Sequence, residues 1–380
     1  MTTLDVRPDE LEIADAPEPG EGDGKAAEPN AAPAVPRRRR TRTLSRQDIL
    51  ALVCSLLASF ALIEIGYEHI LDFSGLLGFL VCWYLTFMAV YALVLSVANS
   101  RVIVVERLVT ATLYVIAAIV LFALGTTVVY VFAKGWHALV HVNFFTHDMS
   151  GVTPNAPLNK GGIYHAIVGT VIEVGSAVAI SLPLGVVTAV YMTEVGGRGS
   201  QLVRTVVEAM TALPEILAGL FVYVILIVDF GLPKSGIAAS VAMAVTMTPI
   251  IARASDVALR VVPGSLREAS NALGAKHWRT VYRVVLPTAR IGLSTALILA
   301  IARGIGETAI PLICSNASSF LTYNPLGTPM NSLPLYIYTM YSTHEPTAIT
   351  RAFGAASVLL LLVLALFVVL RVLVRVRKAK

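Results

Sequence analysis

The sequence predicts an all-α membrane protein, a polytopic bundle of about eight transmembrane helices. The first observation behind this is composition: 56% of the 380 residues are hydrophobic, 14% are charged, and the mean hydropathy is +0.75. A soluble domain carries roughly 25% charged residues. The second is that apolar stretches near 20 residues long, the length that crosses a bilayer, recur along the chain. A chain of this kind has its surface in lipid.

Eight apolar stretches are long enough to cross a bilayer as helices. Gly231, Pro233 and Gly236 predict a very tight turn between the fifth and the sixth. Pro183 and Pro214 are expected to kink or to start a span. The predicted spans are residues 48–67, 74–97, 108–133, 163–192, 213–231, 235–253, 289–311 and 350–374.

Residues 1–46 are predicted to be a disordered cytoplasmic tail, because they are acidic, rich in Pro, Ala and Glu, and hold little apolar surface. They lack the positive n-region and apolar core of a signal peptide. The tail ends in a basic run at residues 37–42. Because an apolar segment follows, we expect this run to anchor the chain on anionic lipid and not to bind nucleic acid.

The distribution of Lys and Arg predicts that both termini are cytoplasmic. With the N-terminus inside, nearly all of the 29 Lys and Arg residues fall in cytoplasmic segments, as the positive-inside rule requires. Arg303 falls inside a span. The residues expected on the opposite side are Lys134, Lys160, Lys234 and Arg351. The sequence therefore predicts a multi-pass protein of the inner (cytoplasmic) membrane.

The sequence offers no support for a catalytic centre or a metal site. His137 and His141 have i,i+4 spacing, but no H-E-x-x-H or cysteine partner accompanies them. The three cysteines form no C-x-x-C pair. The sequence also argues against a membrane enzyme, because neither G-x-S-x-G nor H-E-x-x-H occurs.

The longest cytoplasmic loop, residues 254–288, is predicted to form two short helices that meet at Gly274. Ser265 to Glu268 has the spacing of a capping box, and Pro287 is expected to end the second helix. Such a unit could lie on the membrane surface, or it could dock as a rigid pair of coupling helices in a groove of another protein. The apolar positions are Leu266, Ala269, Ala272 and Leu273 in the first helix and Trp278, Val281, Tyr282 and Val285 in the second.

This loop resembles the EAA motif of type-I ABC importer permeases, whose pattern is E-A-A, three residues, G, nine residues, I, one residue, L-P. Ser270 stands where the family has Ala, and Val284 where it has Ile. The loop also precedes the last pair of spans, as it does in the family. The motif positions that the resemblance implies for coupling to an ATPase are Glu268, Ala269, Ser270, Gly274, Leu286 and Pro287.

The resemblance implies a six-helix type-I permease core at residues 163–374, with the EAA loop at 254–288 and a transmembrane extension at 47–133 before it. It also implies partners: a second permease subunit, two cytoplasmic ATPase subunits that carry ATP and Mg, and an external solute-binding protein. The chain has no G-x-x-x-x-G-K-[ST] motif, so it is expected to bind no ATP itself and not to be an enzyme.

A second motif resembles one group within this family. Residues 302–308, Ala-Arg-Gly-Ile-Gly-Glu-Thr, are similar to the A-R-x-x-G-E-T signature of phosphate importer permeases, and residues 143–146, 161–170 and 332–338 are similar to other segments of their PstA subunits. Over residues 140–375 the resemblance implies a PstA-type subunit that transports phosphate. Its implied partners are a PstC-like permease, PstB-like ATPases and a PstS-like phosphate-binding protein.

Arg303, Glu307 and Thr308 are the predicted pathway residues. Arg303 and Glu307 have i,i+4 spacing about four turns into the seventh span, so they are expected to share one face. A charge at mid-bilayer costs about 2.5–3.5 kcal/mol on insertion scales, and such residues usually mark solute paths. The planar donor fork of arginine suits phosphate oxygens. We hypothesise that Arg303 contacts or gates the anion while Glu307 holds it in the anion's absence; the alternative is a salt bridge that only orders packing.

Glu173, in the fourth span, is a further pathway candidate that either pairs with Arg303 or faces a neighbouring helix. Two other transport functions stay open. Permeases for other oxyanions or small solutes share the EAA loop. A secondary transporter driven by an ion gradient would not need that loop, and its activity would survive loss of the ATPase partner.

Overall fold

The structure is a computed structural model that describes residues 46–70 and 75–376 of the chain; residues 1–45, 71–74 and 377–380 are outside the description. The predicted tail, Arg46 apart, and its basic run therefore lie outside the described residues. The chain forms two compact units, residues 1–114 and 115–380, which divide within one long helix. Each unit is considered by itself.

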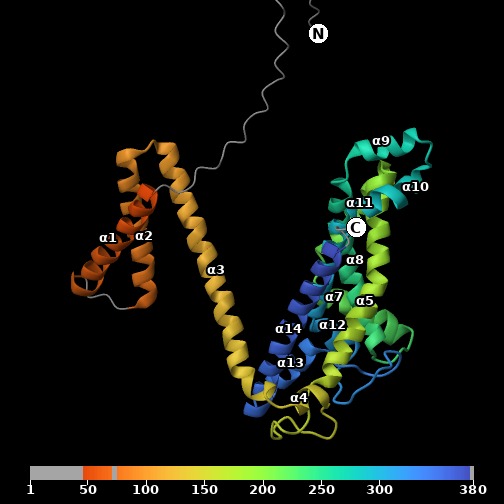
Figure 1. Ribbon diagram of the computed structural model, residues 1–380. Coiled ribbons are helices and arrows are strands. Elements are labelled where there is room, and N and C mark those ends of the chain that lie inside the picture. Colours follow the sequence, from red (N-terminus) through yellow and green to blue (C-terminus); the bar gives the residue numbers. More distant parts are fainter. Residues whose placement is uncertain (1–45, 71–74, 377–380) are drawn as a thin grey trace, which may run out of the picture. The chain divides into compact units, whose positions relative to one another are not determined.

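All regular structure in the described ranges is helical, with four π-helical segments labelled η1 to η4 (Figure 1). The elements are α1 (Arg46–Glu64), η1 (Ile65–Ile70), α2 (Leu76–Ala98), α3 (Arg101–Leu139), α4 (Asn143–Thr146), α5 (Tyr164–Val190), η2 (Tyr191–Val195), α6 (Gly197–Thr211), α7 (Glu215–Val222), η3 (Tyr223–Asp229), α8 (Gly236–Arg260), α9 (Gly264–Ala272), α10 (His277–Thr280), η4 (Val281–Val285), α11 (Leu286–Ile305), α12 (Ala309–Cys314), α13 (Leu333–Ser342) and α14 (Pro346–Val376).

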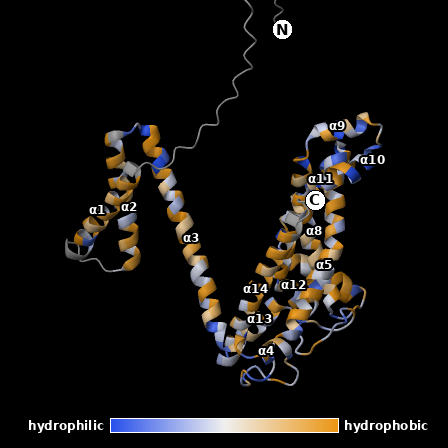
Figure 2. Cartoon of the chain, in the orientation of Figure 1, coloured by the Kyte–Doolittle hydropathy of each residue, from blue (hydrophilic) through white to orange (hydrophobic). Residues whose placement is uncertain are grey.

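Within the described ranges, seven helices are long and apolar enough to cross a membrane, or eight if one bent pair is a single span. This confirms the prediction of about eight spans in a helical bundle. Figure 2 shows hydrophobic residues along the long helices and hydrophilic residues gathered at α9 and α10. The chain is thus a multi-pass membrane protein.

The fifth predicted span, residues 213–231, is present as the helical segment Glu215–Asp229, and Pro214 stands before it as one of the expected alternatives. The sequence analysis did not predict the helix α6, which precedes this segment and is bent by 103° from it. Pro214 stands at the break in extended conformation, with φ −60° and ψ 134°. Proline cannot donate the backbone hydrogen bond that would continue a helix, so the helix is interrupted at Pro214.

Unit 1 is held together by aromatic side chains of α1 and α2. The Phe60 ring meets Trp83 edge to face, with centroids 5.4 Å apart, and the Trp83 indole donates a 3.2 Å hydrogen bond to the Ser59 hydroxyl. The first part of α3 joins them through Ala111, which is buried with Phe87. In lipid the hydrophobic effect does not drive helices together, so aromatic ring contacts such as these contribute to helix packing in addition to van der Waals attraction.

The centre of unit 2 is the contact between α5 and α8, the most extensive in the structure. Small residues make it close: Ala177, Ala239 and Ala242 are fully buried. A Cβ on Gly185 would lie 2.7 Å from the Ile251 side chain. Small residues let membrane helices approach closely, which replaces hydrophobic burial with van der Waals packing. The helices α9 and α10 lie at one end of this bundle and α4 lies at the other (Figure 1).

At the α4 end, a buried arginine joins a loop to α14. The Arg351 side chain is 1% exposed. Its guanidinium donates hydrogen bonds to the carbonyl oxygens of Pro154 (2.8 Å), Pro157 (2.9 Å) and Lys160 (2.9 Å). Three acceptors satisfy a cation that would otherwise be costly to bury. The segment 154–160 is thereby fixed to the start of α14.

Candidate coupling loop and anion pathway

The predicted helix–glycine–helix unit is present as α9, Gly274 and α10. Gly274 has φ +76°, a left-handed conformation that favours glycine. The Ser270 hydroxyl lies 2.9 Å from the Thr280 hydroxyl, so the residue that departs from the family's Ala joins the two helices. The predicted capping box is wrong in detail, because α9 begins at Gly264 after Pro263 and no side chain caps it.

The sequence analysis expected the second helix to end at Pro287, and this prediction is wrong. Instead α10, η4 and α11 run on as one membrane-length segment, His277–Ile305. In η4 the Leu286 amide donates to the Val281 carbonyl, five residues back. A wider turn relieves the clash that a proline ring makes with the preceding turn. The loop is therefore continuous with a spanning helix.

The loop presents an exposed surface at the α9 end of unit 2. Glu268, Ala269 and Pro287 are exposed, and Leu286 is partly buried. Three large apolar side chains are open as well: Leu273 is 89%, Trp278 61% and Tyr282 68% exposed. Exposed apolar groups with a rim of charge are typical of a protein contact surface.

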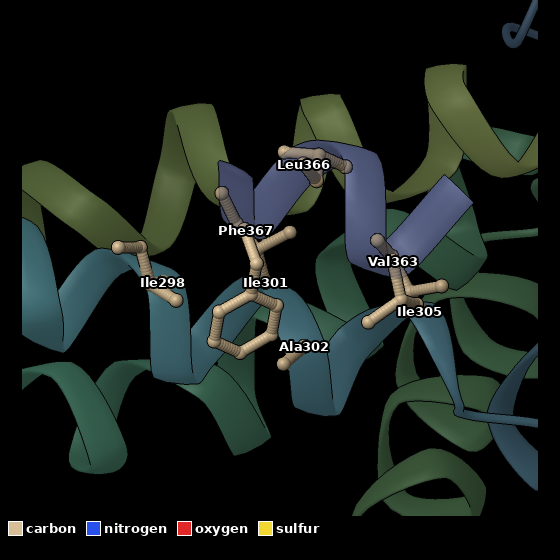
Figure 3. A pocket seen from close by; sticks show the side chains of 7 residues that line it. All are labelled: Ile298, Ile301, Ala302, Ile305, Val363, Leu366 and Phe367. Atoms are coloured by element: carbon tan, nitrogen blue, oxygen red, sulfur yellow. The ribbon is translucent and has the colours of Figure 1, made fainter. Parts of the chain in front are cut away.

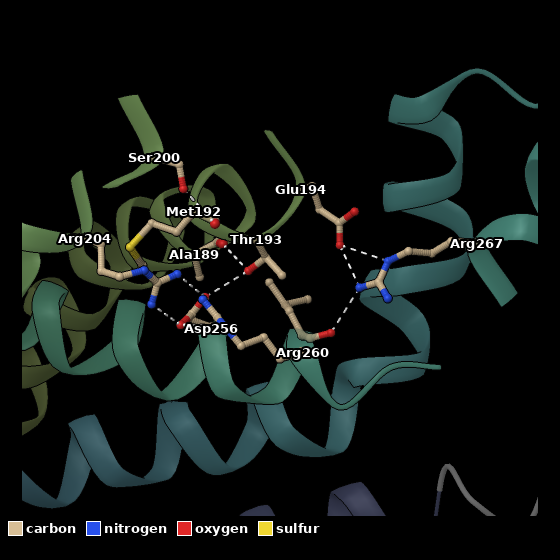
Figure 4. A network of polar contacts seen from close by, with 10 residues as sticks. Ala189, Met192, Thr193, Glu194, Ser200, Arg204, Asp256, Arg260 and Arg267 are labelled. Carbon is tan, nitrogen blue, oxygen red and sulfur yellow. Dashed lines mark hydrogen bonds and ion pairs between the residues drawn. The ribbon is translucent and has the colours of Figure 1, made fainter. Parts of the chain in front are cut away.

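Arg267 connects this loop to two long helices (Figure 4). Its Nη2 lies 2.8 Å from Glu194 Oε1, at the end of η2. It also donates to the carbonyl oxygens of Leu259 (3.2 Å) and Val262 (2.8 Å), at the end of α8. We call this set of contacts the Arg267 latch. It joins α9 to the ends of both helices that form the centre of the bundle.

A second cluster lies beside the latch (Figure 4). Asp256 of α8 receives two hydrogen bonds from Arg204 of α6, at 2.7 and 3.0 Å, and two from Arg260, both at 3.2 Å. The Thr193 hydroxyl donates to the same carboxylate at 3.1 Å. Thr193 precedes Glu194, so the cluster and the latch are adjacent along η2. The sequence analysis predicted no helix between residues 192 and 213, and the i,i+4 spacing of Arg204 and Glu208 on an amphipathic helix is the signal that it missed.

Arg303 pairs with a carboxylate that the sequence analysis did not predict, Glu215 at the start of α7. The two side chains stay 52% and 30% exposed. The expected pairing with Glu307 is wrong, because α11 ends at Ile305, next to Gly304 and Gly306. Glycine lowers helix stability, so the i,i+4 face on which the prediction depended is not formed.

Glu307 caps the next helix instead. Its Oε1 accepts hydrogen bonds from the amides of Ala309 (3.1 Å) and Ile310 (3.4 Å), in the first turn of α12. The Thr308 carbonyl accepts from the Leu312 amide in the same turn. Glu307 is 9% exposed. Both residues therefore order α12, and only Arg303 of the three predicted pathway residues presents a free face.

Glu173 does not pair with Arg303 either. Its side chain is fully buried in α5, and neither carboxyl oxygen has a hydrogen-bond partner in the described residues. The residue packs against a neighbouring helix, as the other alternative expected: its backbone carbonyl accepts a 3.0 Å hydrogen bond from the Ser240 hydroxyl of α8. Ser315 is a polar neighbour of the Glu173 carboxyl group. Its hydroxyl is engaged elsewhere, because it donates to the Met330 carbonyl at 2.8 Å and accepts from the Met330 amide at 3.0 Å.

One small hollow between α11 and α14 is lined by apolar side chains alone. Figure 3 shows its lining, which consists of Ile298, Ile301, Ala302, Ile305, Val363, Leu366 and Phe367. All of these side chains are apolar. In the described ranges no three His, Cys, Asp or Glu side chains group closely enough to hold a metal ion. This hollow therefore holds no charged side chain, whereas Arg303 and the arginines near Asp256 are charged.

A family model described as "Binding-protein-dependent transport system inner membrane component" matches residues 181–378, more than half of the chain. The chain belongs to this family. The matched range contains the coupling loop, the Arg267 latch and both ends of the Arg303–Glu215 pair. Glu173 lies before it.

Curated relatives of this inner-membrane component are permeases. "Phosphate transport system permease protein PstA 1" of Mycobacterium tuberculosis is 39% identical over 234 residues, 61% of this chain and 75% of the relative. The PstA of Mycobacterium leprae is 37% identical over 253 residues, 66% and 82% of the two chains. The PstA of Haemophilus influenzae is 33% identical over 255 residues, 67% and 88%.

A solved structure of the inward-facing MetNI methionine ABC transporter is also similar. It is 24% identical with a TM-score of 0.45, over 57% of this chain and 94% of that one.

Proposed function

We propose that this inner-membrane component is the permease subunit of an ATP-driven phosphate importer. The observation that carries the substrate assignment is its identity with three permeases named for phosphate transport, each matched over three quarters or more of its length. Both termini are cytoplasmic in this proposal, so α9 and α10 face the cytoplasm.

The energy comes from partner subunits. ATP and Mg are bound by two PstB-like ATPases, since this chain has no phosphate-binding loop of its own. The exposed coupling loop docks on an ATPase, and its apolar side chains Leu273, Trp278 and Tyr282 enter the contact. The Arg267 latch then transmits a displacement of α9 to α5 and α8.

The transported anion passes Arg303. Phosphate delivered by a PstS-like binding protein enters between this chain and a PstC-like permease, and its oxygens compete with Glu215 for the Arg303 guanidinium. An exposed ion pair is weak, so a doubly bonded phosphate can replace the carboxylate. When the anion leaves, the pair forms again and the arginine is never left unpaired in the membrane.

Uptake of radiolabelled phosphate tests this function. Cells that lack the gene are complemented with wild type, Gly274→Val or the matched control Gly264→Val. Valine at φ +76° costs about 1–2 kcal/mol and bends the coupling loop. Gly264 has open space and no positive φ. We expect wild type and the Gly264 variant to restore ATP-dependent uptake, and the Gly274 variant to lose most of it at normal membrane levels.

The other outcomes separate the alternatives. If another solute's uptake returns instead, the permease stands and the phosphate assignment fails. If phosphate uptake continues without the ATPase subunits, the chain is a secondary transporter.

A further inference from the structure

A cavity of about 320 Å³ lies between α6 and α8, next to the Arg267 latch. It is large enough for a phosphate group with water around it. Its lining is unusually rich in charge for a membrane helix bundle: Arg204, Arg253 and Arg260, the carboxylates Asp256 and Glu208, and Met192, Val207 and Val257. Three cations against two anions leave the cavity with an excess of positive charge.

The three arginines are not equally engaged. Arg204 and Arg260 both donate to Asp256. Arg253 is exposed, and in the described part of the chain its guanidinium makes a single long hydrogen bond, 3.5 Å, to the Thr211 hydroxyl. An arginine carries five N–H donors. Arg253 therefore has donors to spare for an anion, and it stands at the mouth of a cavity that holds two more guanidinium groups.

Polar residues continue from the cavity along one face of α6. Arg204, Glu208 and Thr211 are spaced four and three residues apart, so they share one face of α6. Glu215, the partner of Arg303, begins α7 directly after the bend. The polar face of α6 thus reaches from the cavity to Thr211, and Ala212, Leu213 and Pro214 separate it in sequence from Glu215.

We propose that the cavity is a second site for a phosphate group, bound by Arg253 together with Arg204 and Arg260. The substrate of the proposed function and the headgroup of an anionic lipid share this chemistry. Occupancy draws Arg204 and Arg260 away from Asp256, because phosphate and carboxylate compete for the same N–H donors. Asp256 also holds Thr193, the neighbour of Glu194 in the Arg267 latch. Phosphate that accumulates on the α9 side therefore slows import by disturbing the latch.

Titration calorimetry of inorganic phosphate into the assembled importer tests the site. The complex is placed in nanodiscs of zwitterionic phosphatidylcholine, without nucleotide or binding protein. Arg253→Gln removes the arginine with donors to spare, while Arg204 and Arg260 still donate to Asp256, so the variant keeps the fold. Arg198→Gln, exposed in the first turn of α6 and outside the cavity lining, is the matched control.

We expect Arg253→Gln to weaken phosphate binding at least tenfold and Arg198→Gln to leave it unchanged. Binding should persist in Arg303→Ala, since that residue belongs to the pathway and not to the cavity. Wild-type affinity in Arg253→Gln overturns the site. The site is also disproved if wild type binds no phosphate in nanodiscs of any lipid composition tested.

Anionic phosphatidylglycerol in the nanodiscs identifies the source of the group. If it weakens phosphate binding to wild type tenfold but has no effect on Arg253→Gln, a lipid headgroup is the occupant. If phosphatidylglycerol changes phosphate binding to neither protein, the occupant is free phosphate. Proteoliposomes preloaded with phosphate should then import phosphate more slowly with wild type, but not with Arg253→Gln.

The failure of this site and of the proposed function are distinguishable. An importer that moves phosphate but shows no effect of Arg253→Gln disproves the site alone. An importer that moves another solute, yet binds phosphate through Arg253, disproves the proposed substrate and keeps the site.

Discussion

The arginines of unit 2 carry the same charge but are held in different ways. Arg351 is enclosed by three carbonyl oxygens, and Arg267 by two carbonyls and a carboxylate. Within the described ranges Arg303 has one carboxylate partner, the half-buried Glu215. Only a contact of the last kind can exchange its partner at low cost, because no buried donor is left unpaired during the exchange.

Exchange of the two charges separates a pathway role from a packing role at Arg303. Arg303→Ala should lower phosphate uptake at least tenfold at normal membrane levels. In the double variant Arg303→Glu, Glu215→Arg the ion pair is restored but the arginine fork has moved to α7, so we expect uptake to stay low. Recovery of uptake in the double variant, measured with labelled phosphate, would mean that the pair only orders packing.

Asp148 gives the α4 end a dependence on pH. Burial raises its pKa, but hydrogen bonds from the Leu321 amide and from Ser150 outweigh this, so the pKa lies below the ordinary 3.8. A carboxyl whose pKa is lowered by folding stabilises the fold above its ordinary value. That contribution is lost as the pH falls through the lowered pKa.

We therefore expect the Leu321 amide, 2.9 Å from Asp148 Oδ2, to exchange its hydrogen faster in acid, beyond the intrinsic dependence of exchange on pH. Hydrogen-exchange mass spectrometry of wild type and Asp148→Asn measures this. The variant should lose the extra acceleration below about pH 4, and an identical profile in the two proteins would contradict the assignment.

Among the elements, the Arg267 latch has the clearest consequence. Arg267→Ala removes charge-assisted hydrogen bonds that stabilise the loop by roughly 1–3 kcal/mol. The helices α9 and α10 keep their own contacts, such as Ser270 with Thr280. We expect the ATPases still to dock and hydrolyse ATP while phosphate uptake falls several-fold.

The ratio of phosphate imported to ATP hydrolysed, measured in proteoliposomes, checks this prediction. Arg279→Ala is a matched control, since Arg279 is exposed and stacks on the Trp278 ring of the same loop. An unchanged ratio in Arg267→Ala would show that the latch does not carry the coupling.

Local patterns predicted some elements well and others poorly. The helix–glycine–helix unit was predictable because its signals, Gly274 and the apolar spacing, lie within one short segment. The helix α6 was missed because Arg198, Arg204 and Glu208 interrupt any apolar run. The Arg303–Glu307 face was wrong because two glycines end α11 early, which a hydropathy pattern does not register. The Glu215 partner lies 88 positions away in the chain, and only the folded bundle brings it close.

At the scale of the whole molecule, the α1–α2 hairpin is expected to be dispensable for transport. It has its own aromatic contacts, and the family model matches only residues 181–378. Removal of residues 1–98 deletes two spans, so the orientation of α3 is kept. We expect such a variant to retain at least half of the wild-type phosphate uptake.

Removal of residues 1–139 is the control for this truncation. It also deletes α3, where Gly135 packs so closely on α14 that a Cβ would lie 2.7 Å from the Gly354 amide. Loss of that contact, together with an odd number of spans, should abolish uptake. If the shorter truncation abolishes uptake at normal membrane levels as well, the hairpin takes part in transport.

The contacts of Arg351 make a loop mechanically part of a helix. Because three carbonyl oxygens of residues 154–160 share one guanidinium on α14, that helix cannot slide along its axis without pulling the segment after it. The segment therefore moves together with α14. A spectroscopic label placed in residues 154–160, at the end of the bundle opposite to α9, would report how far α14 moves in each transport cycle.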